Sequence, residues 1–314
     1  KETGDSSQEA NMRKAIRILA KTPTALAAFY RIRKGKKIIK PKKNLNIAEN
    51  FFYMCFGKVP QKEIVKAFDV SLILYAEHSF NVSTFTARTI TSSLSDIHGA
   101  ITGAIASLKG PLHGGANEEV MHMMNKIKKP ENALKWINDA LENKEVVMGF
   151  GHRVYKSGDS RVPTMRKYFS KVAKIKKPEN ALKWINKALK NKEVIMGFGH
   201  RVYKSGDSRV PTMRQYFGKV AKLKKDKKFE KIYDIVEKVM IKEKNIHPNV
   251  DYPTGPTYHL MGFETDFFTP IFVISRITGW SAHIMEQHAA NKLIRPLASY
   301  KGSKHRKVLE LNQR

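Results

Sequence analysis

Residues 126–173 are repeated almost letter for letter at 174–221, and this repeat limits what the chain can fold into. Five of the 48 aligned positions differ: Asp139/Lys187, Glu142/Lys190, Val147/Ile195, Lys167/Gln215 and Ser170/Gly218. Solenoid repeats diverge more than this between copies, and they need about three or more units to bury a shared core. Two nearly identical copies therefore indicate a segment duplicated inside an ordinary fold and not a repeat architecture.

The charge of the chain is strongly positive, with 58 Lys and Arg against 28 Asp and Glu and a net charge of +30. Such a balance attracts polyanions, so nucleic-acid binding is one hypothesis. The lysines are, however, spread along helical patterns such as 224–244, and no zinc-finger, RNA-binding or leucine-zipper motif accompanies them. A lysine-rich solvated surface is the favoured interpretation, and nucleic acid is not expected as a partner.

The rest of the composition fits a globular chain of 314 residues, 41% of them hydrophobic and 10% aromatic. The one cysteine, Cys55, excludes an internal disulfide and agrees with a reducing compartment. No apolar run approaches the roughly 20 residues of a membrane span, and residues 1–10 lack the apolar core of a signal peptide. We therefore expect a cytoplasmic protein, or one of the mitochondrial matrix if the source is eukaryotic.

The hydrophobic pattern predicts a mostly α-helical fold, since almost nothing alternates with the period of a strand. Residues 62–77 carry apolar side chains on one helical stripe, and 84–108 are rich in Ala, Gly, Ser and Thr, as in a buried helix packed closely on its neighbours. A last long helix is expected at 268–293, with a proline near its start. Gly and Pro breakers separate further predicted helices at 118–128, 131–143, 164–175, 179–191, 212–223 and 227–244.

His113 lies between two predicted helices, after the breaker Gly110-Pro111 and before Glu118-Glu119. The positive end of the following helix dipole disfavours an imidazolium at this place. A neutral imidazole can donate a hydrogen bond to a developing oxyanion such as an enolate. The alternative is that His113 only caps the helix beside a glycine turn, and the local sequence leaves the two interpretations equally open.

The sequence MGFGHRVYKSGDSR occurs at 148–161 and again at 196–209. Its glycines permit close approach of a ligand to the backbone, and His152 or His200 follows them. The arginine that ends it, Arg161 or Arg209, can hold a carboxylate through two parallel hydrogen bonds. The alternative is a glycine loop beside a solvated basic patch, and one such loop alone is a weak signal.

Asp251 lies in HPNVDYPTG, which we expect to be a loop bounded by prolines with few charged neighbours. A carboxylate of this kind can act as a general base if partial burial raises its pKa. The commoner role for such a residue is to form an Asx turn. The sequences around His78 and Arg295 do not by themselves indicate a functional role.

Taken together and in this order, the motifs resemble those of the citrate synthase family. The segments that match family signatures are AEHSFNVSTFTAR, GPLHGGANEEVM, MGFGHRVYK, NVDYPTG and LIRPLASY, and the match runs from about residue 18 to the C-terminus. GDSRVPTM, YHLMGFETDFFTPIF and RITGWSAHIMEQ are most similar to the short bacterial type, especially the 2-methylcitrate synthases. The resemblance implies a two-domain helical homodimer that condenses acetyl-CoA or propionyl-CoA with oxaloacetate. It implies no metal and no tightly bound cofactor, since the coenzyme A thioester is a substrate.

The resemblance also implies roles for individual residues. His113 matches the histidine that stabilises the enol of the thioester, and Asp251 matches the base that removes the proton beside the thioester carbonyl. His152 or His200 matches the histidine that polarises and protonates the oxaloacetate ketone. The positions that match oxaloacetate-binding residues are His78, Arg161 or Arg209, Arg295 and Arg314. In the family the last of these arginines reaches in from the other subunit, which is why a homodimer is implied.

Two features depart from the family pattern. The family has one GFGH loop between the HGGAN helix and the aspartate, whereas this chain has two, and deletion of either copy restores the usual frame. We also expect an N-terminal part of the large domain to be missing. The expected division is a large helical domain from 1–115 and 263–314 and a small domain from 116–262 that holds both copies. The alternative function is a non-catalytic remnant, inert or retained as a basic anion-binding protein.

Overall fold

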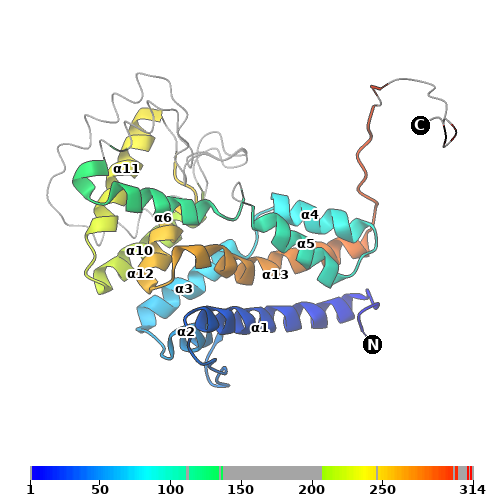
Figure 1. Cartoon of the computed structure of the whole chain (residues 1–314), viewed down its shortest axis with the longest axis horizontal. Coiled ribbons are helices and arrows are strands. Elements are labelled where there is room, and N and C mark those ends of the chain that lie inside the picture. The colour runs from blue at the N-terminus through cyan, green and yellow to red at the C-terminus, as the bar shows by residue number, and fades with distance from the viewer. Residues whose placement is uncertain are drawn as a thin grey trace.

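The computed structural model describes residues 2–110, 113–133, 136, 207–244, 247–299, 301–302, 310 and 312 (Figure 1). The regular elements within these ranges are all helical, which confirms the mostly α fold expected from the sequence. In chain order they are α1 (Gln8–Arg33), α2 (Ile47–Phe56), α3 (Lys62–Tyr75), α4 (Val82–Ser92), α5 (Ile97–Leu108), α6 (Ala116–Ile127), α10 (Arg209–Leu223), α11 (Lys228–Lys244), α12 (Asp251–Met261), the 3-10 turn η1 (Thr265–Phe267) and α13 (Phe268–Ala289).

The single helix expected over 84–108 is wrong, because two helices, α4 and α5, share this stretch. Leu94 adopts a left-handed backbone conformation with φ of 66°, which an α-helix does not allow. Asp96 then starts α5 by accepting the backbone N–H of Gly99 at 2.9 Å. The Ser-rich break before an N-cap aspartate was a helix boundary that the apolar pattern concealed.

The loop expected around Asp251 is also wrong, because Asp251 is the first residue of helix α12. Pro253 falls in the first turn of α12, where a missing backbone N–H leaves no intrahelical hydrogen bond unmade. Helix α13 ends at Ala289, four residues before the expected end. The helices predicted at 164–175 and 179–191, and most of the one at 131–143, lie outside the described residues.

Helix α13 is the element around which the others pack, since it contacts α1, α3, α4, α5 and α6 (Figure 1). An aromatic cluster fills the core beside it, with Phe51, Phe52 and Phe68 packed against Phe263 at ring-centroid separations of 5.5 to 5.7 Å. One continuous set of buried side chains joins α1–α3 with α6 and α10–α13. The proposed boundary between a large and a small domain therefore stays a prediction.

The two copies of the repeat contribute different parts of this core. Lys126 and Ile127 of the first copy close α6, and Ala133 of the same copy is buried. Residues 209–221 of the second copy form nearly all of α10, with Met213 and Phe217 fully buried. The described part of the fold thus contains the start of the first copy and the end of the second.

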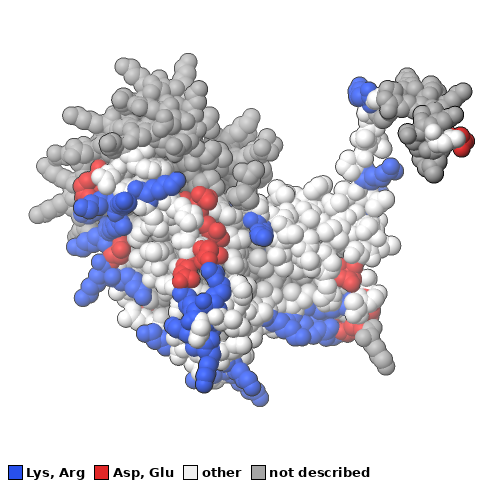
Figure 2. Space-filling model, in the orientation of Figure 1, with Lys and Arg blue, Asp and Glu red and all other residues white. Residues whose placement is uncertain are grey.

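Charged side chains are unevenly spread over the surface. On the face in Figure 2, Lys and Arg lie at several separate places with Asp and Glu between them, while the region over α4 and α5 is nearly free of charge. Phe80, Val82 and Phe85 are 60%, 62% and 48% exposed near the start of α4. Within the described ranges, no helix is long and apolar enough to span a bilayer.

Candidate active site

His113 lies in the turn between α5 and α6 and points its ring at the start of α4. Its Nε2 accepts the backbone N–H of Ser83 at 3.2 Å and lies 2.8 Å from the Ser83 hydroxyl. A backbone N–H can only donate, so Nε2 carries no proton and the neutral ring keeps its proton on Nδ1. This arrangement leaves Nδ1–H as a hydrogen-bond donor.

Ser83 is itself held from a third helix. Trp280 of α13 donates from Nε1 to the Ser83 hydroxyl at 3.1 Å, and both side chains are buried. Asn81 caps α4 and accepts from the Ser83 hydroxyl at 2.8 Å. The ring of His113 therefore caps α4, not the helix that follows it, whose N-cap makes no side-chain hydrogen bond.

The surroundings of His113 favour its neutral form. Burial, with a smaller contribution from the positive charge of Arg276, lowers the pKa of His113 from 6.5 to about 4. Gly114 makes the turn tight, because a Cβ there would lie 2.3 Å from the Leu108 carbonyl oxygen. Burial is thus the largest cause of the lowered pKa, in addition to the helix dipole on which the sequence-based expectation rested.

This shift predicts that His113 weakens the fold in acid. A group whose folded pKa lies below its unfolded value binds more protons in the unfolded chain. Its contribution to the free energy of unfolding is therefore complete above pH 6.5 and is lost as the pH falls toward 4. At pH 4.5 the loss from His113 is about 2–3 kcal/mol. Urea denaturation at pH 7 and 4.5 should show a smaller acid loss for His113→Gln than for the wild type. Equal losses in the two proteins would contradict the buried neutral imidazole.

Asp251 starts α12 and lies against the end of α3. Its Oδ1 accepts a hydrogen bond from the Tyr75 hydroxyl at 2.5 Å. Burial raises the pKa of Asp251, while Tyr75, Arg209 and Arg276 each act to lower it. The Asx-turn alternative is wrong for this residue, because Pro253, two residues on, has no backbone N–H for the Asp251 side chain to accept. The Asx turn here belongs to Asn249, whose Oδ1 accepts the backbone N–H of Asp251 at 3.0 Å.

Arg209, the first residue of α10, is one of two buried cations beside Asp251. Asp207 holds its guanidinium, with Nη2 to Oδ2 at 2.8 Å and Nε to Oδ1 at 3.1 Å. The same carboxylate accepts the backbone N–H of Val250 at 3.3 Å, directly before Asp251. Asp207 therefore fixes Arg209 against the start of α12, and burial lowers the pKa of Arg209 to about 9.

Arg276 of α13 is the second cation, and sequence reasoning missed it. Its side chain is 1% exposed, its Nε donates to the Tyr75 carbonyl at 2.6 Å, and its Nη1 has no hydrogen-bond partner within the described part of the chain. Burial lowers its pKa to about 9, so it stays charged at neutral pH. A lone arginine inside the apolar run FTPIFVISRITGW was the signal that could have revealed it.

Helix α13 connects the two halves of this site. Arg276 reaches Tyr75 and the surroundings of Asp251, and Trp280, one helical turn later, reaches Ser83 and His113. A neutral donor, a partly buried carboxylate and two buried arginines thus lie around one stretch of α13. Such a set can bind a dicarboxylate and move a proton beside a carbonyl group.

The remaining predicted residues are placed as follows. His78 is half-buried between α3 and α4, and its carbonyl accepts from the Asn81 side chain at 3.2 Å. Arg295 is exposed on residues 291–299, which leave the helices after α13 (Figure 1). The backbone N–H of the neighbouring Ile294 donates to the Ser92 hydroxyl at 3.0 Å. Ser92 lies at the opposite end of α4 from Ser83, so the chain does not itself bring Arg295 to His113. His152, His200, Arg161 and Arg314 lie outside the described residues.

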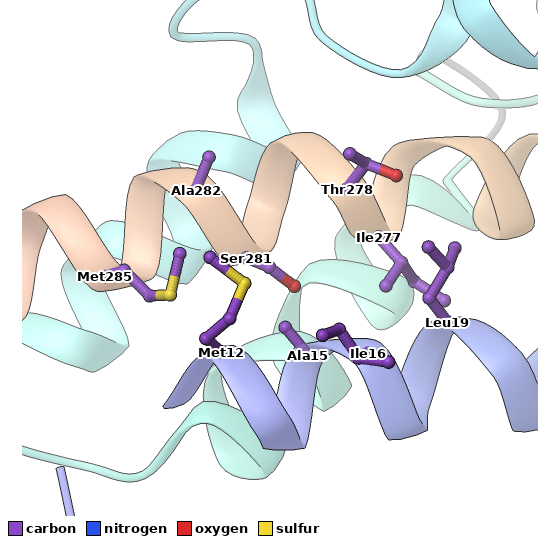
Figure 3. A pocket seen from close by; sticks show the side chains of 9 residues that line it. All are labelled: Met12, Ala15, Ile16, Leu19, Ile277, Thr278, Ser281, Ala282 and Met285. Atoms are coloured by element: carbon purple, nitrogen blue, oxygen red, sulfur yellow. The ribbon is translucent and has the colours of Figure 1, made fainter. Parts of the chain in front are cut away.

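A separate groove lies between α1 and α13 (Figure 3). Met12, Ile16, Leu19, Ile277 and Met285 line it, with Ser281 among its few polar groups. It contains none of the predicted site residues. Its apolar lining offers no charge to a dicarboxylate, so it is not the candidate active site.

Comparison with known proteins identifies relatives of the chain by sequence. A sequence model described as "Citrate synthase, C-terminal domain" matches the chain twice, over residues 1–179 and 171–297. Each match contains one complete copy of the repeat. The 2-methylcitrate synthase 2 of Corynebacterium glutamicum is 46% identical over 302 residues, which are 95% of this chain and 66% of that protein. The chain therefore spans just under two thirds of that relative.

Solved structures give the same result. A citrate synthase from Thermotoga maritima superimposes with a TM-score of 0.73 at 32% identity, covering 98% of this chain and 71% of that one. A citrate synthase from Thermoplasma acidophilum, solved as a ternary complex with carboxymethyl coenzyme A and oxaloacetate, gives a TM-score of 0.71 at 30% identity over 98% of this chain and 70% of that one.

Proposed function

The chain belongs to the citrate synthase family, and on that premise we propose that it joins an acyl-CoA thioester to oxaloacetate and releases coenzyme A. The observation that carries this proposal is the pairing, through α13, of a neutral imidazole donor with a partly buried carboxylate of raised pKa. Removal of a proton next to a thioester carbonyl needs both groups at once.

The first step follows from these two residues. Asp251 takes a proton from the carbon next to the thioester carbonyl, which its raised pKa favours. His113 donates from Nδ1–H to the thioester oxygen as negative charge develops there, and it remains neutral. Partial burial of both groups strengthens these interactions, because less water screens them than at the surface.

The second step requires oxaloacetate. Arg209 and Arg276 supply charges for its two carboxylates, and His78 lies between α3 and α4 as a further donor. The enol carbon bonds to the ketone carbon of oxaloacetate, and the ketone oxygen takes a proton from His152 or His200. Water then cleaves the thioester, which releases the coenzyme A thiol and leaves citrate from acetyl-CoA or 2-methylcitrate from propionyl-CoA. The site carries this chemistry with no tightly bound cofactor.

The protein acts as a homodimer in this proposal. The nearly uncharged region over α4 and α5, with Phe80, Val82 and Phe85 exposed, supports it, because apolar patches of this kind mark protein interfaces. Arg314 would then serve the site of the other subunit. The single buried cysteine, Cys55, is compatible with a cytoplasmic location. Sedimentation velocity on the purified chain tests the dimer directly.

Release of thiol from acetyl-CoA and from propionyl-CoA, each with and without oxaloacetate, tests the function. Oxaloacetate-dependent release is expected, and the ratio of the two rates identifies the acyl group. One methyl group in a pocket changes the binding free energy of the transition state by only about 1–3 kcal/mol, so both substrates should react at measurable rates. A folded chain that releases no thiol with either substrate would support the alternative of a non-catalytic remnant that binds anions.

A further inference from the structure

Tyr75 is the last residue of α3, and its side chain faces the base of the proposed reaction. It is 1% exposed, and its hydroxyl donates to Asp251 Oδ1 at 2.5 Å. Among the residues that the structure describes, it is the one side chain that donates to this carboxylate. A partly buried carboxylate with one side-chain donor takes its orientation from that donor.

Helix α13 holds Tyr75 so that the phenol has little freedom. The ring of Phe272 meets the Tyr75 ring edge to face, with centroids 4.4 Å apart and planes at 78°. The Tyr75 carbonyl accepts from Arg276 Nε at 2.6 Å, and the next carbonyl, of Ala76, accepts from Gly279 N–H at 3.0 Å. A Cβ at Gly279 would lie 2.3 Å from that Ala76 oxygen, so the two helices touch through their backbones.

We propose that Tyr75 is a positioning residue for Asp251, whose hydroxyl holds Oδ1 and leaves Oδ2 as the oxygen that takes the substrate proton. This inference rests on the proposed function, in which Asp251 is the base. Tyr75 acts through Asp251 and does not itself touch the reacting carbon. One residue thereby serves two groups, since its carbonyl orients Arg276 and its hydroxyl orients Asp251.

The same hydrogen bond adjusts the acidity of the base. The groups that face Asp251 are Tyr75 from α3, Arg209 from α10 and Arg276 from α13, and all three lower its pKa against the effect of burial. A donor favours the ionised carboxylate, so its removal must raise the pKa. Asp251 would then become an active base only at higher pH.

Tyr258 provides a matched control. Its hydroxyl also bridges α3 and α12, at 2.9 Å from the Ser71 hydroxyl, and its side chain is also 1% exposed. Tyr258 makes no hydrogen bond to Asp251. Tyr258→Phe therefore removes a buried hydroxyl between the same two helices and leaves the base untouched.

A titration of the Asp251 carboxyl group tests the contact without any activity. Carbon-13 NMR of chain labelled at its aspartate carboxyls, with Asp251 assigned by its absence in Asp251→Asn, follows this group directly. In Tyr75→Phe the midpoint should rise by about one pH unit, a tenfold change in proton affinity. In Tyr258→Phe it should not move. An unchanged midpoint in Tyr75→Phe overturns the proposal.

Kinetics on the same variants test the consequence for the reaction. Tyr75→Phe should lower kcat about tenfold and move the acidic limb of the pH profile upward, with KM for oxaloacetate within twofold of the wild type. An equal loss in both variants, or a loss confined to KM, would show a structural role only and would overturn the proposal. A wild type without oxaloacetate-dependent activity would refute the proposed function, and the NMR titration would still decide whether Tyr75 tunes Asp251.

Discussion

Replacement of Asp251 by Asn is expected to lower kcat by about a thousandfold, because an amide cannot take the proton from the thioester substrate. The shape of the site should survive, since the Asn oxygen can still accept from the Tyr75 hydroxyl. KM for oxaloacetate should change by less than about threefold, because Arg209 and Arg276 keep their contacts. Steady-state thiol release at saturating acyl-CoA measures both constants.

Asp226→Asn is the control for this variant. Asp226 caps the start of α11 by accepting the backbone N–H of Phe229 at 3.0 Å, and it has no role in the proposed reaction. Its substitution should leave kcat within twofold of the wild type. If Asp251→Asn kept more than a tenth of the wild-type kcat, another group would have to be the base.

The second large effect concerns the doubled GFGH loop. Deletion of 134–181 leaves only His200, and deletion of 159–206 leaves only His152, while both shortened chains keep Arg209. The two products differ at three positions, which correspond to Asp139/Lys187, Glu142/Lys190 and Val147/Ile195. Because each deletion restores a single loop between His113 and Asp251, both shortened chains should condense acyl-CoA with oxaloacetate at least as fast as the full chain.

Removal of the remaining histidine should then abolish most of that rate. His200→Ala in the first shortened chain and His152→Ala in the second should each lower kcat by about a hundredfold to ten-thousandfold, the range typical of general acid–base catalysis. In the full-length chain, one of the substitutions His152→Ala and His200→Ala should lower kcat by as much, and the other should leave kcat almost unchanged. Full activity of a shortened chain without any GFGH histidine would refute the assigned role.

Much of the fold could be predicted from the sequence, and the failures have physical reasons. Helices α3, α6, α10, α11 and α13 lie on the apolar stripes expected at 62–77, 118–128, 212–223, 227–244 and 268–293. The break between α4 and α5 was missed because their apolar faces run on across it, and only Leu94 and Asp96 mark the turn. Helix α12 was missed because its two prolines resemble loop residues, although Pro253 falls in a position that a helix tolerates.

The site was predictable only in part. His113 and Asp251 stand beside glycines and prolines that draw attention to them, but their partners carry no local signal. Tyr75 and Asp251 are 176 residues apart in the chain, so no pattern within a short window connects them. Arg276 was missed because a helix of apolar residues suggests a core, and the groups that favour its buried charge, the Tyr75 carbonyl and the carboxylates of Glu77 and Asp251, lie far from it in the sequence.

The most direct test of the central claim is whether a carbon–carbon bond forms. The wild-type chain should be incubated with unlabelled propionyl-CoA or acetyl-CoA and uniformly carbon-13 labelled oxaloacetate, and the products identified by mass spectrometry. Condensation predicts a tricarboxylate that contains the labelled oxaloacetate carbons together with the unlabelled acyl carbons, in an amount equal to the coenzyme A released. Release of coenzyme A with unlabelled acetate or propionate as the only acid product would show simple thioester hydrolysis and would contradict the account.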